Sequence, residues 1–114
     1  MSISRAMRLV RAGSVWLVPI FLLLALGVRA QESGESLFKS KCAMCHAADG
    51  SGKSAMGEKL KVPDLHSAEI QGKSEAELKA VISKGKNKMP AYDGKLSKEQ
   101  IDKLADYIRK LEKH

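Results

Sequence analysis

The stretch Cys42-Ala43-Met44-Cys45-His46 decides how the rest of this chain is organised. Its two cysteines are the only ones in the sequence. Two thiols three positions apart, followed directly by an imidazole, are what covalent haem attachment requires: each sulfur adds to a haem vinyl group, and the histidine nitrogen binds the iron. The motif therefore predicts one haem c attached through Cys42 and Cys45, with His46 as an iron ligand.

A Cys-x-x-Cys pair also occurs in zinc sites and in thioredoxin-like dithiols. A zinc site needs two further ligands, and the other candidates are His66 and His114, since no second cysteine pair exists. A redox dithiol is expected at the end of a strand in a βαβ unit, and no strand-like alternation flanks the motif. Both alternatives are weaker than haem attachment.

The first thirty residues have the pattern of a secretory signal peptide. Arginines precede a mostly apolar run over residues 15–28, and small residues at Val28 and Ala30 suit a signal peptidase. The run is shorter than the roughly 20 residues that span a bilayer, and Pro19 interrupts it. We expect cleavage after Ala30, export to the periplasm, and a mature domain of residues 31–114 with no stable membrane insertion.

Removal of the signal peptide changes the charge. Four of the 20 Lys and Arg residues, and none of the 13 Asp and Glu residues, precede Gln31, so the net charge falls from +7 to +3. The mature chain retains one arginine, Arg109, and no series of aromatic residues on which bases could stack. We expect no nucleic-acid partner.

The mature sequence has few large apolar residues. It contains 7 Leu, 4 Ile, 2 Val, 3 Met, 1 Phe and 2 Tyr. A domain of this length rarely gains more than a few kcal/mol from its own core and usually needs a cofactor, a metal or disulfides. The apolar porphyrin is therefore expected to complete the core, and the chain without haem is expected to be largely unfolded.

The patterns predict an all-α fold with three to four short helices around the haem. One helix begins after Ser33 and runs into the motif, and Ser67 caps a short turn. Capping boxes at Ser74 and Ser97 begin two more helices, the first of which ends at Gly85. The last helix has the apolar face Ile101, Leu104, Ala105, Ile108 and Leu111. Residues 47–61, rich in Gly, Ser and Lys, are predicted to form a loop along one haem edge.

With these features the chain resembles the class I c-type cytochromes, which are small single-haem electron carriers. The motif lies near the mature N-terminus, and Met89-Pro90 lies in the loop before the last helix, as in that family. The resemblance covers nearly all of residues 31–114. It also implies that the first and last helices cross near the haem. The residues that match this crossing are Gly34, Phe38, Leu104 and Tyr107.

The resemblance implies that His46 is the proximal ligand and that its other ring N–H donates to the carbonyl of Pro63. For the sixth ligand, Met44 lies inside the motif and has no route to the opposite haem face. Met56 could reach the iron, but its ligation would leave Met89 unexplained. Met89 is expected to be the ligand, because a capped helix and a following proline present it in an ordered loop. His66 and His114 are less favoured alternatives.

An iron held by histidine and methionine has no open position, which suits electron transfer and not substrate chemistry. We therefore expect a monomeric electron carrier, not an enzyme, that shuttles between redox enzymes. Lys84, Lys86 and Lys88 are expected to ring the haem edge and dock acidic redox partners, and Lys41 and Lys53 are further candidates for this surface.

Two other classes of function stay open. One is a haem sensor or weak peroxidase in which Met89 is labile, and it would show a high-spin spectrum. The other is an electron-entry subunit of a larger dehydrogenase or oxidase complex, and it would expose a large apolar patch.

Overall fold

The structure is a computed structural model that describes Gly13 and residues 31–113. Apart from Gly13, the predicted signal peptide lies outside the described residues, so the division into 1–30 and 31–114 stays a prediction. Within the described part of the chain, no helix is both long and apolar enough to cross a membrane.

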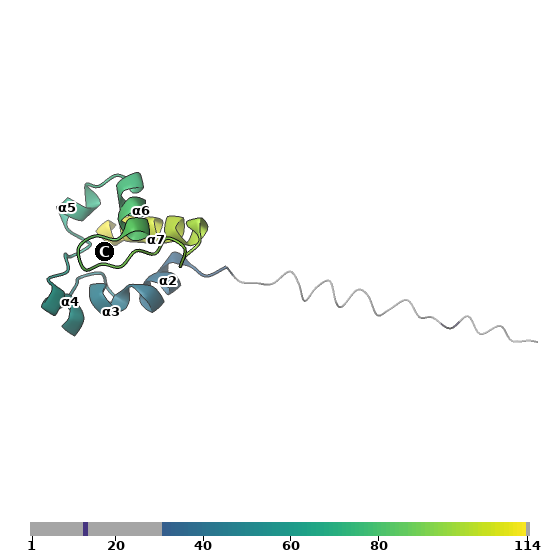
Figure 1. Ribbon diagram of the computed structural model, residues 1–114, viewed down its shortest axis with the longest axis horizontal. Helices are drawn as coiled ribbons and strands as arrows, with labels where there is room; N and C mark the ends of the chain where they lie inside the picture. Colours follow the sequence, from purple (N-terminus) through teal and green to yellow (C-terminus); the bar gives the residue numbers. More distant parts are fainter. Residues whose placement is uncertain (1–12, 14–30, 114) are drawn as a thin grey trace, which may run out of the picture. The chain divides into compact units, whose positions relative to one another are not determined.

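The described residues fold into helices, as predicted (Figure 1). The elements are α2 (Gly34–Lys41), α3 (Ala43–His46), α4 (Ala55–Leu60), α5 (Ala68–Gln71), α6 (Glu75–Lys84), α7 (Lys98–Lys110) and the 3-10 helix η1 (Leu111–Lys113). In Figure 1, α2, α3 and α4 lie along one side and α5, α6 and α7 along the other. The segment between α6 and α7 passes between these two groups.

Serine side chains begin most of these helices. In α2, α4, α5, α6 and α7 the N-cap serine accepts a hydrogen bond from a backbone N–H of the first turn. The caps are Ser33, Ser54, Ser67, Ser74 and Ser97. Both predicted capping boxes are present, in α6 and α7.

The predicted loop over residues 47–61 is wrong in part, because α4 occupies Ala55–Leu60. Ser54 caps this helix, and Lys61 ends it in the left-handed conformation (φ 55°). A helix of 6 residues shows too little of the 3.6-residue period to be recognised from its apolar residues. The three longer helices are α2, α6 and α7, and the short helices bring the total in the described part above the three to four that we expected.

The core lies where α2, α6 and α7 meet. Its buried side chains are Leu37, Phe38, Leu65, Ile70, Leu78, Ile82, Leu96, Ile101, Leu104, Ala105, Ile108 and Leu111. The apolar face predicted for the last helix is buried as expected, which confirms that the 3.6-residue period identified the inner side of α7.

The first and last helices cross at Gly34, as the resemblance implied. A Cβ atom added to Gly34 would collide with the carbonyl oxygen of Lys103 and lie 3.1 Å from the Cβ of Tyr107. Next to this contact the rings of Phe38 and Tyr107 lie 5.2 Å apart between centroids. A residue without a side chain is needed here because the two backbones touch.

Replacing Gly34 with alanine should therefore force α2 and α7 apart. We expect the free energy of unfolding of the haem-loaded protein to fall by about 1 to 3 kcal/mol, the usual cost of overpacking. Urea unfolding followed by circular dichroism measures it. Ser36→Ala, on the exposed side of the same helix, should change stability by less than about 0.5 kcal/mol. Equal effects of the two changes would contradict the tight crossing.

Candidate haem-binding site

The motif lies at a break between two helices. The amide of Cys42 still donates to the carbonyl of Phe38 (2.8 Å), but the backbone of Cys42 (φ −116°, ψ −30°) then leaves the helical path, and α3 begins. Cys42 and Cys45 are half-buried free thiols. Burial, with a smaller contribution from Cys45, raises the pKa of Cys42 to about 11, so this thiol is protonated at neutral pH.

Helix α4 packs directly on the backbone of the motif. The Ser54 hydroxyl lies 2.8 Å from the carbonyl oxygen of Met44 and 3.0 Å from that of Cys45. A Cβ atom added to Gly57 would collide with the carbonyl oxygens of Cys45 and Gly52. This support is absent from the predictions above, although Ser54 before an acidic first turn is a local helix signal.

His46 is held at the end of α3 with its ring beside that of Phe38, at 6.3 Å between centroids and a tilt of 43°. Burial lowers the pKa of His46, which favours the neutral imidazole, the form that binds a metal ion. Its Nδ1 atom is buried and has no hydrogen-bond partner among the described residues. A neutral ring with an unpartnered buried nitrogen, next to two free thiols, fits a covalently attached haem.

The predicted hydrogen bond from His46 to the carbonyl of Pro63 is not formed. Gly52 lies next to His46 on one side, because the amide of Gly52 (φ 76°) donates to the carbonyl of His46 at 2.8 Å. A Cβ atom on Gly52 would lie 2.7 Å from the Val62 oxygen and 3.4 Å from the Pro63 oxygen. These two carbonyls therefore lie close to Gly52, and a side chain at position 52 would collide with the Val62 oxygen.

Met89 lies in a tight turn in the segment after α6. The amide of Met89 donates to the carbonyl of Lys86 (2.9 Å), the amide of Lys86 donates back (3.3 Å), and Asn87 is left-handed (φ 54°). Gly85 (φ 73°) precedes the turn, and a Cβ atom there would lie 2.6 Å from the carbonyl oxygen of Met89. A side chain at position 85 would therefore displace Met89.

The loop of residues 85–96, called here the Met89 loop, is also tied to α6 and to the motif. The amide of Tyr92 donates to the carbonyl of Ile82 (3.0 Å), and the Tyr92 hydroxyl donates to the carbonyl of Lys41 (3.0 Å). The half-buried side chains of Cys42, Met89 and Tyr92 pack against the same core. The structure thus brings the Met89 loop to the segment that contains Cys42.

The other candidates for the sixth iron ligand are more exposed than Met89, already hydrogen-bonded, or outside the described residues. Met44 is 78% exposed and Met56 is 40% exposed, whereas Met89 is half-buried. His66 bonds through Nδ1 to the Asp64 carboxylate at 2.6 Å. His114 lies outside the described residues.

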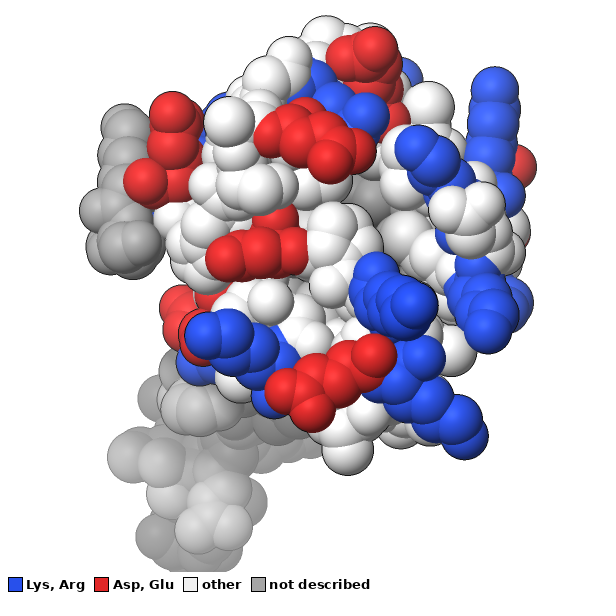
Figure 2. Space-filling model, turned by 90° about the vertical axis from the view of Figure 1, so that its left-hand side faces the viewer, with Lys and Arg blue, Asp and Glu red and all other residues white. Residues whose placement is uncertain are grey.

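The predicted docking lysines lie at the surface beside Met89. Lys84 is in the last turn of α6, and Lys86 and Lys88 are in the tight turn; all three are exposed. Figure 2 shows one face of the molecule, on which many blue Lys and Arg side chains lie towards the right-hand side. Red Asp and Glu side chains lie at the top, centre and left, with some blue side chains among them.

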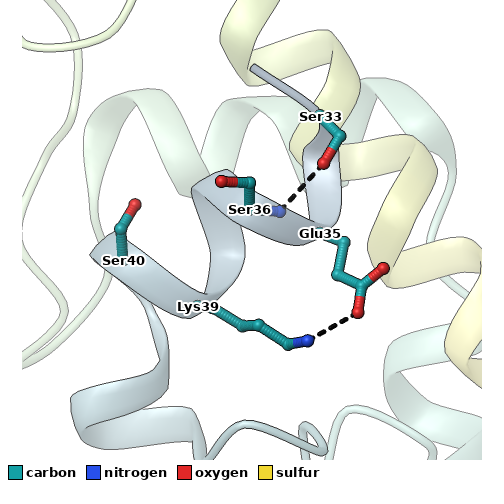
Figure 3. Close-up of a pocket in the computed structure, with 5 residues that line it drawn as sticks. All are labelled: Ser33, Glu35, Ser36, Lys39 and Ser40. Carbon is teal, nitrogen blue, oxygen red and sulfur yellow. Dashed lines mark hydrogen bonds and ion pairs between the residues drawn. The ribbon is translucent and has the colours of Figure 1, made fainter.

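The outer surface of α2 has a shallow depression (Figure 3). Its lining residues are Ser33, Glu35, Ser36, Lys39 and Ser40. Ser33 caps the amide of Ser36 (3.1 Å), and Lys39 forms an ion pair with Glu35 (2.6 Å). These interactions stabilise the exposed side of a helix, so we assign no ligand to the depression.

Comparison with known proteins identifies similar chains. The family model for cytochrome c oxidase, cbb3-type, subunit III matches residues 29–108. Cytochrome c6 of Pyropia tenera is 34% identical over 77 residues, which are 68% of this chain and 87% of that protein. Cytochrome c6 of Nostoc sp. (strain PCC 7120 / SAG 25.82 / UTEX 2576) is 39% identical over 77 residues, 67% of this chain and 66% of that protein.

A solved structure is also similar. The KustC0563 c-type cytochrome matches with a TM-score of 0.64 and 27% sequence identity, over 69% of this chain and 96% of that one. This likeness agrees with the all-α arrangement described above.

Proposed function

Because the chain belongs to the class I c-type cytochromes, which transfer electrons with a covalently bound haem c, we propose that it is an exported one-electron carrier with an iron bound by His46 and Met89. The observation that supports this proposal best is the joining of the Met89 loop to the motif. A hydrogen bond from Tyr92 to Lys41 and a shared core connect two segments that lie far apart in the sequence.

Each residue of the site has a separate role in this proposal. Cys42 and Cys45 would hold the haem through two thioethers, and His46 and Met89 would bind the iron. The bound haem supplies an iron that alternates between the ferrous and ferric states. With the same two side chains bound to the iron in both oxidation states, electron transfer would need little rearrangement of the protein, and no ligand position would be open to a substrate.

The oxidase description of the matching family model favours a second candidate, a subunit of a larger oxidase complex. Such a subunit would bury a large apolar surface against its neighbours. In the described part of the chain the exposed large apolar side chains are Met44 and Met56, which is a small area. We therefore prefer the free carrier. The apparent mass of the protein in mild extracts of its natural source distinguishes the two.

Absorption spectra of the purified oxidised and reduced protein test the ligand assignment. The oxidised form should be low-spin and should show the weak charge-transfer band from methionine sulfur to ferric iron. A high-spin oxidised spectrum would favour the sensor or weak peroxidase instead.

Replacing Lys84, Lys86 and Lys88 by glutamine in one triple variant should alter electron exchange with charged reagents. We expect oxidation of the reduced protein by ferricyanide, an anion, to slow several-fold at low ionic strength, and oxidation by a cationic cobalt(III) complex to accelerate. Both effects should vanish at about 1 M salt, where the screening length is about 3 Å. Lys110→Gln, an exposed lysine beside Ser33 and Gly34, is the control and should change neither rate. Unchanged ferricyanide kinetics in the triple variant would exclude these lysines from the electron-exchange surface.

A further inference from the structure

Tyr92 links two segments on which the proposed site depends. Its hydroxyl donates a 3.0 Å hydrogen bond to the carbonyl oxygen of Lys41, which is 51 positions away in the sequence. Lys41 is the last residue of α2 and directly precedes Cys42. Tyr92 follows Met89 by three positions. The bond therefore joins the Met89 loop to the backbone beside the first cysteine of the motif.

The acceptor is a carbonyl that has lost its usual helical partner. In an uninterrupted α-helix the amide of Cys45 would donate to the carbonyl of Lys41. Here the amide of Cys45 donates to the carbonyl of Cys42 at 3.2 Å, because the chain breaks at Cys42 (φ −116°). A carbonyl freed at a helix end bonds to a side chain or to water, and here the donor is the Tyr92 hydroxyl, in a hydrogen bond at the protein surface.

The Tyr92 hydroxyl is protonated, and the rest of the residue is held in place. A tyrosine hydroxyl keeps its proton at neutral pH, and partial burial raises the pKa of Tyr92 further. Its ring packs against the core, and its amide donates to the carbonyl of Ile82 in α6. The residue is thus held by its backbone to α6 and by its side chain to the end of α2.

We propose that Tyr92 is a positioning residue for the distal ligand. By bonding to the Lys41 carbonyl it holds the Met89 loop against the haem-attachment motif and slows dissociation of the methionine from the iron. This inference rests on the proposed function, because it takes Met89 as the iron ligand. Nothing in the local sequence around Tyr92 distinguishes this role from ordinary core packing, since the acceptor belongs to a distant helix end.

Tyr92→Phe tests the inference, because it removes the hydroxyl and keeps the ring. In the oxidised, haem-loaded protein, added imidazole should displace the methionine about two- to tenfold faster, the factor that corresponds to one lost hydrogen bond. Loss of the charge-transfer band follows this displacement. Amide hydrogen exchange in residues 85–96 should accelerate by a similar factor, while exchange in the centre of α7 stays unchanged.

Tyr107→Phe is the matched control. Tyr107 also packs against the core and contacts Phe38, but its hydroxyl forms no hydrogen bond with a described residue. Tyr107→Phe should leave the rate of methionine displacement and the rate of amide exchange in residues 85–96 at the wild-type values. Wild-type rates in Tyr92→Phe would overturn the inference, and so would equal acceleration in both variants, which would indicate general loosening of the core.

The ligand assignment and the role of Tyr92 can fail separately. If Met89→Ala keeps the charge-transfer band, the proposed ligand is wrong and the role of Tyr92 in ligand retention fails with it. If the band is lost in Met89→Ala but Tyr92→Phe behaves as wild type, the ligand assignment stands and the positioning role alone is overturned.

Discussion

Replacing Met89 with alanine is expected to lower the reduction potential by a few tenths of a volt, within the range of roughly 0.8 V that axial ligands cover. The soft thioether sulfur stabilises ferrous iron, whereas the ligands that replace it, water or the amine of Lys86 or Lys88, favour ferric iron. The haem should stay attached, because Cys42 and Cys45 are untouched. A spectroelectrochemical titration measures the potential, and the charge-transfer band should disappear.

Met56→Ala is the control for this change. Met56 is 40% exposed on α4, and its loss should leave both the potential and the spectrum nearly unchanged. The opposite pattern, with Met56 sensitive and Met89 silent, would transfer the ligand assignment to Met56. If neither variant changed the potential or the spectrum, the sixth ligand would be a histidine or the position would be open, and the sensor would be favoured.

The Met89 loop should keep its overall path in Met89→Ala. The amides of Tyr92 and Asp93 donate to carbonyls of α6 at 3.0 Å each, and these bonds do not involve the iron. We therefore expect the helical circular dichroism to persist at room temperature, so that the loss of potential is not caused by unfolding.

Replacing both cysteines of the motif with serine is expected to abolish covalent haem and, with it, cooperative folding. The core of Leu, Ile and Phe side chains is small, and Cys42, His46, Met89 and Tyr92 are half-buried residues that the porphyrin would cover. A domain of this size has only a few kcal/mol of stability from such a core. A pyridine haemochrome assay should find no thioether-bound haem, and the haem-free chain should show little helix and no thermal transition by circular dichroism.

Met44→Ala, between the two cysteines, is the matched control. Met44 is 78% exposed, so its loss should affect neither haem attachment nor melting. Single Cys42→Ser and Cys45→Ser variants should retain less haem than wild type, because each removes one of two covalent bonds. A haem-free chain with a cooperative, native-like transition would contradict the dependence of the fold on haem.

Local patterns in the sequence were sufficient to predict the longer helices α2, α6 and α7 and the attachment chemistry. The caps at Ser74 and Ser97 and the apolar face of α7 involve residues within a few positions of each other, so their geometry follows from the helical period alone. The same holds for the motif, in which the spacing of Cys42, Cys45 and His46 carries the chemistry. Helix α4 was not predicted, because it is too short to display the helical period.

Only the tertiary structure decided how these parts meet. That Gly57 touches the backbone of Cys45, and that Nδ1 of His46 has no hydrogen bond to the carbonyl of Pro63, depends on the path of the chain between distant segments. The bond from Tyr92 to Lys41 depends in addition on a helix break that frees one carbonyl. Backbone groups of this kind are present in every residue, so their availability is set by where the chain turns and which segment packs beside it, and no residue type in the sequence encodes it.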